Sequence, residues 1–187
     1  MGRLTRGVIS MSVVVMLTAC SGDTMEQLET HVRQAGVKVL TAYKQRERLV
    51  PQLLDAADWT MSSEQEVMNE VSVAYRQSQL RLSNEASLVD PQEVREALFP
   101  QAALSSALAE LLITTERYPQ LRADPYFQSL VTQLQSAESN IADQQLQYQQ
   151  HLEQYNDYIG AFPNWITAKI LGYEKQPLFL EVWDASY

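Results

Sequence analysis

The sequence predicts an all-α protein, folded as an elongated antiparallel four-helix bundle with coiled-coil-like packing. Three observations support this fold class. Only 6 of the 187 residues are glycine, too few for a turn-rich β architecture. Ala, Leu, Gln and Glu, which favour helices, dominate the chain. Between residues 125 and 160, apolar side chains recur every seven residues, the repeat of left-handed helix packing.

The chain begins with a short apolar segment behind a basic start. Arg3 and Arg6 precede an apolar stretch from Val8 to Leu17, and the small residues Thr18 and Ala19 follow. This order is typical of a secretory signal peptide, and the stretch is short for a membrane span. The segment therefore predicts export from the cytoplasm.

The end of this segment, "LTAC", resembles a bacterial lipobox, in which the cysteine is acylated and becomes the new N-terminus. We expect residues 1–19 to be removed as a lipoprotein signal peptide. Cys20 would then carry several acyl chains such as palmitate, enough for lasting attachment. Residues 20–23 would form a short tether, and residues 24–187 the helical domain. The alternative is an uncleaved signal anchor, in which the cysteine is incidental.

The residue after the cysteine bears on the membrane that holds the protein. Ser21 stands where an aspartate would resemble the retention signal for the inner membrane of Gram-negative cells. We therefore expect an extracytoplasmic protein, at the periplasmic face of the outer membrane if the host is Gram-negative.

Charge and cysteine content exclude several classes of function. The formal net charge is −9, and loss of Arg3 and Arg6 with the signal leaves 12 basic against 23 acidic side chains, a net charge of −11. An acidic surface repels nucleic acid, so we expect no nucleic-acid partner. Because Cys20 is the only cysteine, no thiol remains for a disulfide, a thiolate metal site or redox chemistry.

Apolar residues at helical spacing predict a first helix from Thr24 to about Trp59. Pro51 lies inside it and should kink the helix or end it early. Ser62 or Ser63, followed by Glu66 at capping-box spacing, predicts the start of a second helix that runs to about residue 82.

The third region is predicted as two helices. Asp90 and Pro91 read as a cap and a first helical residue, which opens a short helix to about Leu98. Pro100 then opens the third long helix. Its apolar stripe comprises Leu104, Leu108, Leu111, Thr115 and Tyr118.

A turn bounded by Pro119 and Pro125, with Asp124 as the cap, leads to the fourth long helix. This helix, from Pro125 to Gly160, would be roughly 54 Å long. Its seven-residue repeat consists of Phe127, Leu134, Ile141, Tyr148 and Tyr155, with Leu130, Ala137, Leu152 and Ile159 filling the seam. A helix of this length with one apolar stripe must lie against other long helices.

The segment after Gly160 is the most apolar part of the chain outside the signal. Pro163 can open a short helix that ends at Gly172. The face of this helix comprises Trp165, Ile166, Ile170 and Leu171. We expect Trp165, Tyr173 and Phe179 to close the end of the bundle, while the tail offers an edge to a partner. The alternative is an exposed apolar patch that marks a partner or membrane contact.

Several separated motifs resemble the LemA family of bacterial membrane-associated proteins. They are "ERLVPQLLDA", "LAELLITTERYPQLRADPYFQSLVTQLQSAESNIA" and "YNDYIGAFPNWITAKILGYEKQPLF". Within them, the "ERYPQLRA" turn, Glu138 and the segment 162–173 carry the match. The chain departs from the family pattern near Gln145, where members tend to have arginine, and at Gln149, where they tend to have asparagine. The resemblance implies a long helical bundle at a membrane, mostly outside the cytoplasm, and supplies no established enzymatic activity.

Candidate metal and catalytic residues are few. His31 and His151 lack the glutamate three residues earlier that di-metal bundles use, so we expect no metal site and no cofactor. Neither a G-x-S-x-G motif, a phosphate loop nor an H-E-x-x-H motif is present. Glu116 and Glu138 could form an acid pair, but pairing with Arg117 and Arg122 is the more ordinary role.

Tyr148, Tyr155, Tyr158 and Trp165 form a late aromatic cluster, which suits core packing at a half-wet bundle end and, alternatively, a binding platform. Our leading hypothesis is a non-enzymatic, lipid-anchored envelope scaffold or adaptor with an envelope protein partner. The alternatives are a module that binds a ligand or glycan, and an enzyme whose site is assembled only in space.

Overall fold

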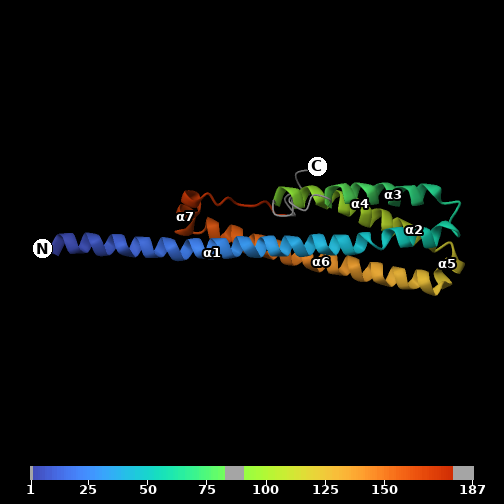
Figure 1. The fold of residues 1–187 in the computed structure, drawn as a ribbon, viewed down its shortest axis with the longest axis horizontal. Helices are drawn as coiled ribbons and strands as arrows, with labels where there is room; N and C mark the ends of the chain where they lie inside the picture. Colours follow the sequence, from blue (N-terminus) through green and yellow to red (C-terminus); the bar gives the residue numbers. More distant parts are fainter. Residues whose placement is uncertain (1, 83–90, 179–187) are drawn as a thin grey trace. The chain divides into compact units, whose positions relative to one another are not determined.

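The computed structural model describes the backbone of residues 2–82 and 91–178, and the side chains of residues 23–79 and 96–178. Over these residues the protein is all helical, without a strand, as predicted. The helices are α1 (Gly2–Glu47), α2 (Val50–Asp58), α3 (Gln65–Leu82), α4 (Pro91–Thr115), α5 (Pro119–Ala123), α6 (Pro125–Gly160) and α7 (Asn164–Leu171), drawn in Figure 1. They form two compact units, residues 36–147 and residues 1–35 with 148–187, described separately below.

The first predicted helix starts earlier than expected, whereas its predicted interruption near Pro51 is present. α1 begins at Gly2 rather than at Thr24, because no proline interrupts the predicted signal and tether segments. At the other end, α1 stops at Glu47 and α2 restarts at Val50, with Pro51 in its first turn. The expected effect of Pro51 is therefore confirmed. The missing amide of a proline is harmless in a first turn, where the N–H groups have no partner within the helix.

Ser63 does not cap α3 with its hydroxyl, contrary to the prediction. The helix begins at Gln65, and the Ser63 hydroxyl lies 2.9 Å from the Tyr118 hydroxyl, to which it is hydrogen-bonded. That tyrosine in turn donates to Glu64 at 2.7 Å. The serine thus ties the α2–α3 connection to the end of α4.

The prediction that Pro100 opens a helix is wrong. α4 is a single helix from Pro91 to Thr115 with Pro100 inside it, and the predicted cap Asp90 lies outside the described residues. A proline within a helix removes one hydrogen bond at a cost of about 3 kcal/mol. Buried side chains on both sides of Pro100, among them Leu98 and Leu104, pack tightly enough to hold the helix through it.

Among the described side chains, the stretch Glu96–Thr115 is apolar and long enough to cross a membrane by composition. Core helices of water-soluble domains pass the same test, and 44% of this stretch is buried inside the structure. Because it supplies Leu104, Leu108 and Leu111 to the core, we interpret it as a core helix.

The unit of residues 36–147 has one continuous apolar core. α3 and α4 pack along each other (Figure 1), and α2 and α6 add apolar side chains. The fully buried members of this core include Val50, Leu53, Met61, Val71, Leu104, Leu111, Phe127 and Leu130. The predicted turn before α6 contains the short helix α5, and the Asp124 carboxylate accepts the Phe127 amide at 2.8 Å, which confirms Asp124 as a cap.

α6 has the predicted bounds, and its seven-residue repeat is buried at every position from Phe127 to Tyr155. In the unit of residues 1–35 and 148–187, its last turns lie near α1, since the rings of His31 and His151 are 5.7 Å apart. Tyr155 donates to the carbonyl of Glu174 at 3.0 Å, and Asn156 accepts the amide of Gln176 at 2.8 Å. These bonds fix the chain that follows α7 alongside the end of α6.

α7 occupies its predicted place but not its predicted role. Gly172 ends the helix in the left-handed conformation, with φ 81°, which a side chain would disfavour. The buried residues of α7 are Thr167 and Ala168, whereas Trp165 is 48% exposed. The expectation that Trp165 closes a core is therefore wrong, because the small side chains of this helix face inward. Tyr173 is half-buried, and Phe179 lies outside the described residues.

Candidate functional site

The most unusual residue in the unit of residues 36–147 is a fully buried arginine. Arg46 has 0% exposed surface. It follows Val39, Val32 and Met25 at seven-residue intervals, and all three are buried apolar residues of α1. Arg46 therefore occupies a position that the pattern of α1 reserves for a core side chain.

Three helices supply the partners of the guanidinium. Arg46 Nη1 donates to Glu138 Oε1 on α6 at 2.8 Å and to the Ser105 hydroxyl on α4. Nη2 donates to the Gln101 carbonyl oxygen at 3.0 Å and to the Gln101 side-chain oxygen. The guanidinium carbon also lies 5.8 Å from the centre of the Tyr43 ring, within cation–π range.

A second buried charge lies next to the first. Glu47 is almost fully buried, and its carboxylate accepts the Ser78 hydroxyl of α3 at 2.8 Å and Gln101 Nε2 at 2.9 Å. The Gln101 amide therefore bridges the two ionic residues, because its oxygen accepts from Arg46 while its nitrogen donates to Glu47. We call the set of Tyr43, Arg46, Glu47, Ser78, Gln101, Ser105, Glu138 and Gln145 the polar cluster.

Tyr43 extends the polar cluster to Gln145 and is itself buried. Its hydroxyl accepts a hydrogen bond from Gln145 Nε2 at 2.6 Å. Burial raises the pKa of Tyr43 to about 12, although the Gln145 bond and the Arg46 charge act in the opposite direction. The phenol is thus neutral at physiological pH and serves as a hydrogen-bonding group.

The polar cluster is suited to positioning helices. One guanidinium and two carboxylates give it a formal charge of −1, and its side chains mostly hydrogen-bond one another. Arg46 Nε is the buried cluster atom without a partner. Buried polar groups that satisfy one another fit in one register only, since sliding any helix would leave a charge unpaired.

Glu116 and Glu138, the candidate acid pair, are not brought together. Glu138 contacts Ser105, which precedes Glu116 by 11 residues, or roughly 16 Å of helix. Glu116 pairs with Arg122, as expected, whereas Arg117 pairs with Glu64 at 3.1 Å. Glu116 and Arg122 line an open pocket of about 400 Å³. Their ion pair is largely exposed to water.

The remaining candidate residues lie in the unit of residues 1–35 and 148–187. His31 is exposed and His151 half-buried, and among the described residues no three His, Cys, Asp or Glu side chains gather as metal ligands. Trp165 and Tyr173 line an open cleft of about 300 Å³ with Lys169 and Lys175. Tyr148 and Tyr155 are buried, as core packing predicts, and Tyr158 is half-buried. Cys20 lies within α1, and its side chain is outside the described part.

Reasoning from sequence missed Arg46, Glu47 and Gln101. The available signal was heptad position, because Arg46 continues the Met25–Val39 series and Gln101 stands seven residues before the buried Leu108. Glu138 appears in the sequence only as one of the residues that carry the family resemblance. The sequence does not show that these residues, which lie on different helices, contact one another in the fold.

Comparison with known proteins agrees with the motifs in the sequence. The LemA family profile matches residues 35–186. This range contains every residue of the polar cluster as well as α7. No curated protein matches the chain. Because the match covers most of the sequence, the chain belongs to the LemA family.

Proposed function

We propose that this protein is a lipid-anchored, non-enzymatic scaffold or adaptor of the cell envelope. Residues 1–19 are a signal peptide, and acylated Cys20 holds the mature chain to the membrane. Residues 24–187 form an antiparallel four-helix bundle outside the cytoplasm, at the periplasmic face of the outer membrane if the host is Gram-negative. Members of the LemA family are generally membrane-associated, which supports this location.

The proposal is carried by the hydrogen bonds that the charged side chains of the polar cluster form with one another and with neighbouring helices. Arg46, Glu47 and Glu138 are bonded to side chains of neighbouring helices. A catalytic group needs access to a substrate and a free proton or lone pair. Side chains whose hydrogen bonds are directed to one another favour a structural role. A helical domain on a lipid anchor suits a scaffold that docks an envelope protein.

A second candidate is a module that binds a small ligand or glycan. The cleft of about 300 Å³ beside α7 favours it, since Trp165 and Tyr173 offer aromatic surfaces there, with Lys169 and Lys175 nearby. Its open form provides less enclosure than small-molecule sites usually have. We therefore rank this function second.

The anchor is tested by Cys20→Ala, with Ser21→Ala as the matched control. We expect the parent and the control to float with membranes and to show a mass that matches an acylated chain starting at Cys20. The Cys20→Ala chain should keep residues 1–19 or leave the membrane fraction. Unchanged mass and attachment in that variant would rule out the lipid anchor.

The scaffold role is tested by cross-linking in intact envelopes followed by mass spectrometry. A scaffold should give reproducible cross-links to one or a few envelope proteins, and these should disappear when Cys20→Ala displaces the chain. Glycan binding by purified protein without any specific cross-link would favour the second candidate.

A further inference from the structure

α7 and the residue pair before it carry five of the twelve large apolar side chains that are exposed in the described part. The small side chains of Thr167 and Ala168 face inward, and the large ones face water. The exposed fractions are 81% for Phe162, 48% for Trp165, 41% for Ile166, 76% for Ile170 and 55% for Leu171. An apolar patch of this kind on a soluble domain marks a contact with a partner or a membrane.

The position of α7 within its unit indicates a membrane contact rather than a protein partner. The His31–His151 contact sets the level of α6 against α1. α6 ends nine residues after His151, at Gly160, and nine residues before His31 stands Gly22. Burial and then the charge of Glu29 raise the pKa of Tyr155. Tyr155 follows His151 by four residues and Glu29 precedes His31 by two, as expected for helices that run in opposite directions here.

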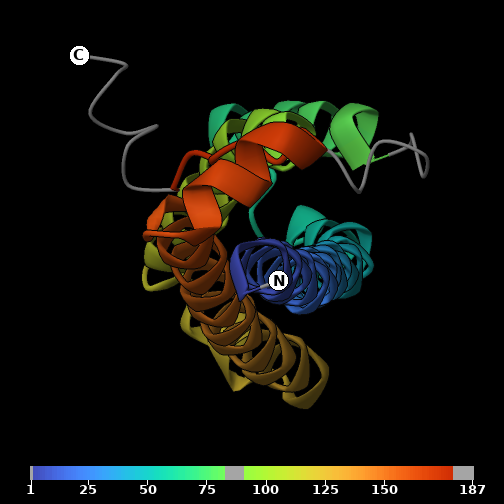
Figure 2. The same ribbon diagram turned by 90° about the vertical axis from the view of Figure 1, so that its left-hand side faces the viewer.

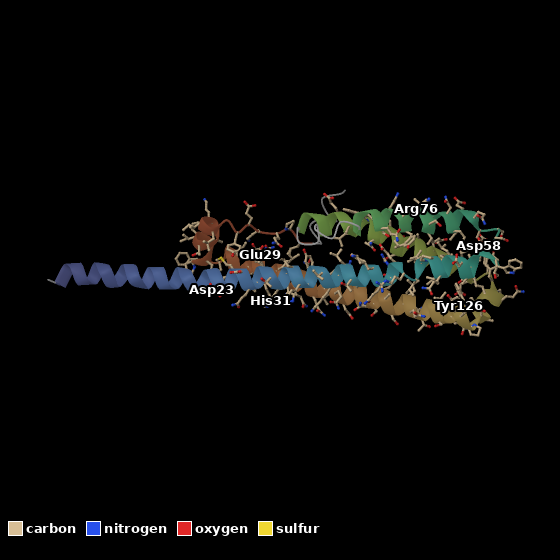
Figure 3. All side chains as sticks on the ribbon, in the orientation of Figure 1. Asp23, Glu29, His31, Asp58, Arg76 and Tyr126 are labelled. Atoms are coloured by element: carbon tan, nitrogen blue, oxygen red, sulfur yellow. The ribbon has the colours of Figure 1, made fainter. Side chains whose placement is uncertain are left out.

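This register puts α7 at the level of the residues around Cys20, next to the apolar segment 8–17. Figures 1 and 2 show α7 at the end of the unit where this N-terminal part of α1 lies, and Figure 3 labels Asp23 on the neighbouring stretch. Whether the chain is held by a lipid on Cys20 or by segment 8–17, the bilayer begins at this level. The exposed apolar face of α7 is therefore located where a membrane surface is expected.

The chemistry of the segment also fits a lipid surface. Between residues 161 and 173 Lys169 is the only charged residue, in a chain with a net charge of −9. An acidic protein is repelled by anionic lipid, and this segment is a local exception with one positive charge. Tryptophan is favoured at the headgroup level, and a lysine on the same face can extend its ammonium group to the headgroups.

We infer that α7 is a second membrane contact. It lies in the membrane interface with Phe162, Trp165, Ile166 and Ile170 in the boundary between headgroups and acyl chains. A helix held in this way adds binding to an anchor of acyl chains and limits the tilt of the unit that carries it. This inference rests on the proposed attachment of the chain at Cys20.

The test uses tryptophan fluorescence of the full, processed chain in vesicles of phosphatidylethanolamine and phosphatidylglycerol. One variant keeps Trp165 alone (Trp59→Phe, Trp183→Phe), and the control keeps Trp59 alone (Trp165→Phe, Trp183→Phe). Trp59 lies at the end of α2 and is 93% exposed. With lipids brominated near the headgroup, we expect quenching and a blue shift for Trp165, and neither for Trp59.

A second comparison uses exposed isoleucines, whose replacement leaves the core intact. Ile170→Ser on α7 should abolish most of the quenching of Trp165. Ile113→Ser on α4, which removes an isoleucine of similar exposure, 64% against 76%, should leave it unchanged. Both variants should remain attached to the vesicles, because the anchor is untouched.

Flotation separates failure of this inference from failure of the proposed function. Attachment is measured first, and quenching is read on the attached fraction alone. Unquenched Trp165 in attached protein would overturn the inference while leaving the anchor in place. A protein partner cross-linked at Trp165, without quenching by lipid, would overturn it as well. If the Cys20→Ala protein stays attached and Trp165 is still quenched, the membrane contact of α7 is supported and the lipid anchor is contradicted.

Discussion

Arg46 shows how one residue can outweigh an apolar pattern. A buried guanidinium costs several kcal/mol in lost hydration, and good geometry with several partners is needed to offset this. Glu138, Gln101 and Ser105 supply such partners. A leucine at this position would pack without that cost. We therefore interpret the arginine as a residue that selects one register among the helices.

We predict that Arg46 and Glu138 are energetically coupled. Glu138→Gln should lower the free energy of unfolding by about 1–3 kcal/mol, because it leaves a buried guanidinium without its carboxylate, although Glu138 itself is one-third exposed. Arg46→Met should also destabilise the chain. The double variant should lose less than the two single losses together, as measured by urea unfolding.

The exposed pair Arg33–Glu29, with a 2.6 Å contact on one helix face, is the matched control. The corresponding cycle of Arg33→Met and Glu29→Gln should give a coupling below about 0.5 kcal/mol. Equal coupling in the two cycles would contradict the special role assigned to Arg46.

At the scale of single elements, local signals predicted α6 well and α4 poorly. The bounds of α6 follow from the cap at Asp124, the proline after it and the unbroken heptad. For α4, Pro100 looked like the start of a helix, since proline favours first turns. Whether a helix continues through a proline depends on packing against α3, and that information is spread over residues distant in sequence.

We predict that charge on the seam of α6 is far more disruptive than charge on its outer face. Leu134→Asp places a carboxylate where the native side chain is 2% exposed, and should destabilise the helical body by more than about 3 kcal/mol. Gln133→Asp, at the neighbouring exposed position, should cost less than about 1 kcal/mol. Thermal melts followed by circular dichroism distinguish the two. Similar melting of both variants would show that the seam is wrongly assigned.

At the scale of the molecule, the sequence predicted the helical class but not the role of α7. The amino-acid composition and the helical spacing of apolar residues predict the all-α fold class directly. The inward face of a short helix is instead chosen by the surface that it meets, and here Thr167 and Ala168 fit that surface. The polar cluster was unpredictable for a related reason, since its members come from four separate helices.

We predict a loss of stability in alkali with a contribution from each unit. The pKa of Tyr43 and that of Tyr155 are both raised from 10.0 to about 12 by burial. Between pH 10 and 12 the unfolded chain loses these protons while the folded chain keeps them. Stability present below pH 10 is therefore lost as the pH rises to 12, by about 2 kcal/mol for Tyr43.

Tyr43→Phe and Tyr155→Phe should each flatten this pH dependence, with Tyr118→Phe as the control. The measurement is urea unfolding at intervals from pH 9 to 12, in which the slope against pH is compared rather than the absolute stability. Slopes unchanged by both variants would show that neither phenol is shielded from water in the folded state.

The separation of Arg46 from Glu138 along the chain has a consequence for the order of synthesis. The two residues are 92 positions apart, and Gln101 and Ser105 follow Arg46 by 55 and 59 positions. While the chain emerges, α1 to α4 are complete long before the carboxylate of α6 is available. A compact intermediate built from those helices alone would bury the guanidinium without its direct carboxylate partner, Glu138, which is unfavourable. Compaction of the nascent chain is thus disfavoured until α6, its last long helix, has been synthesised.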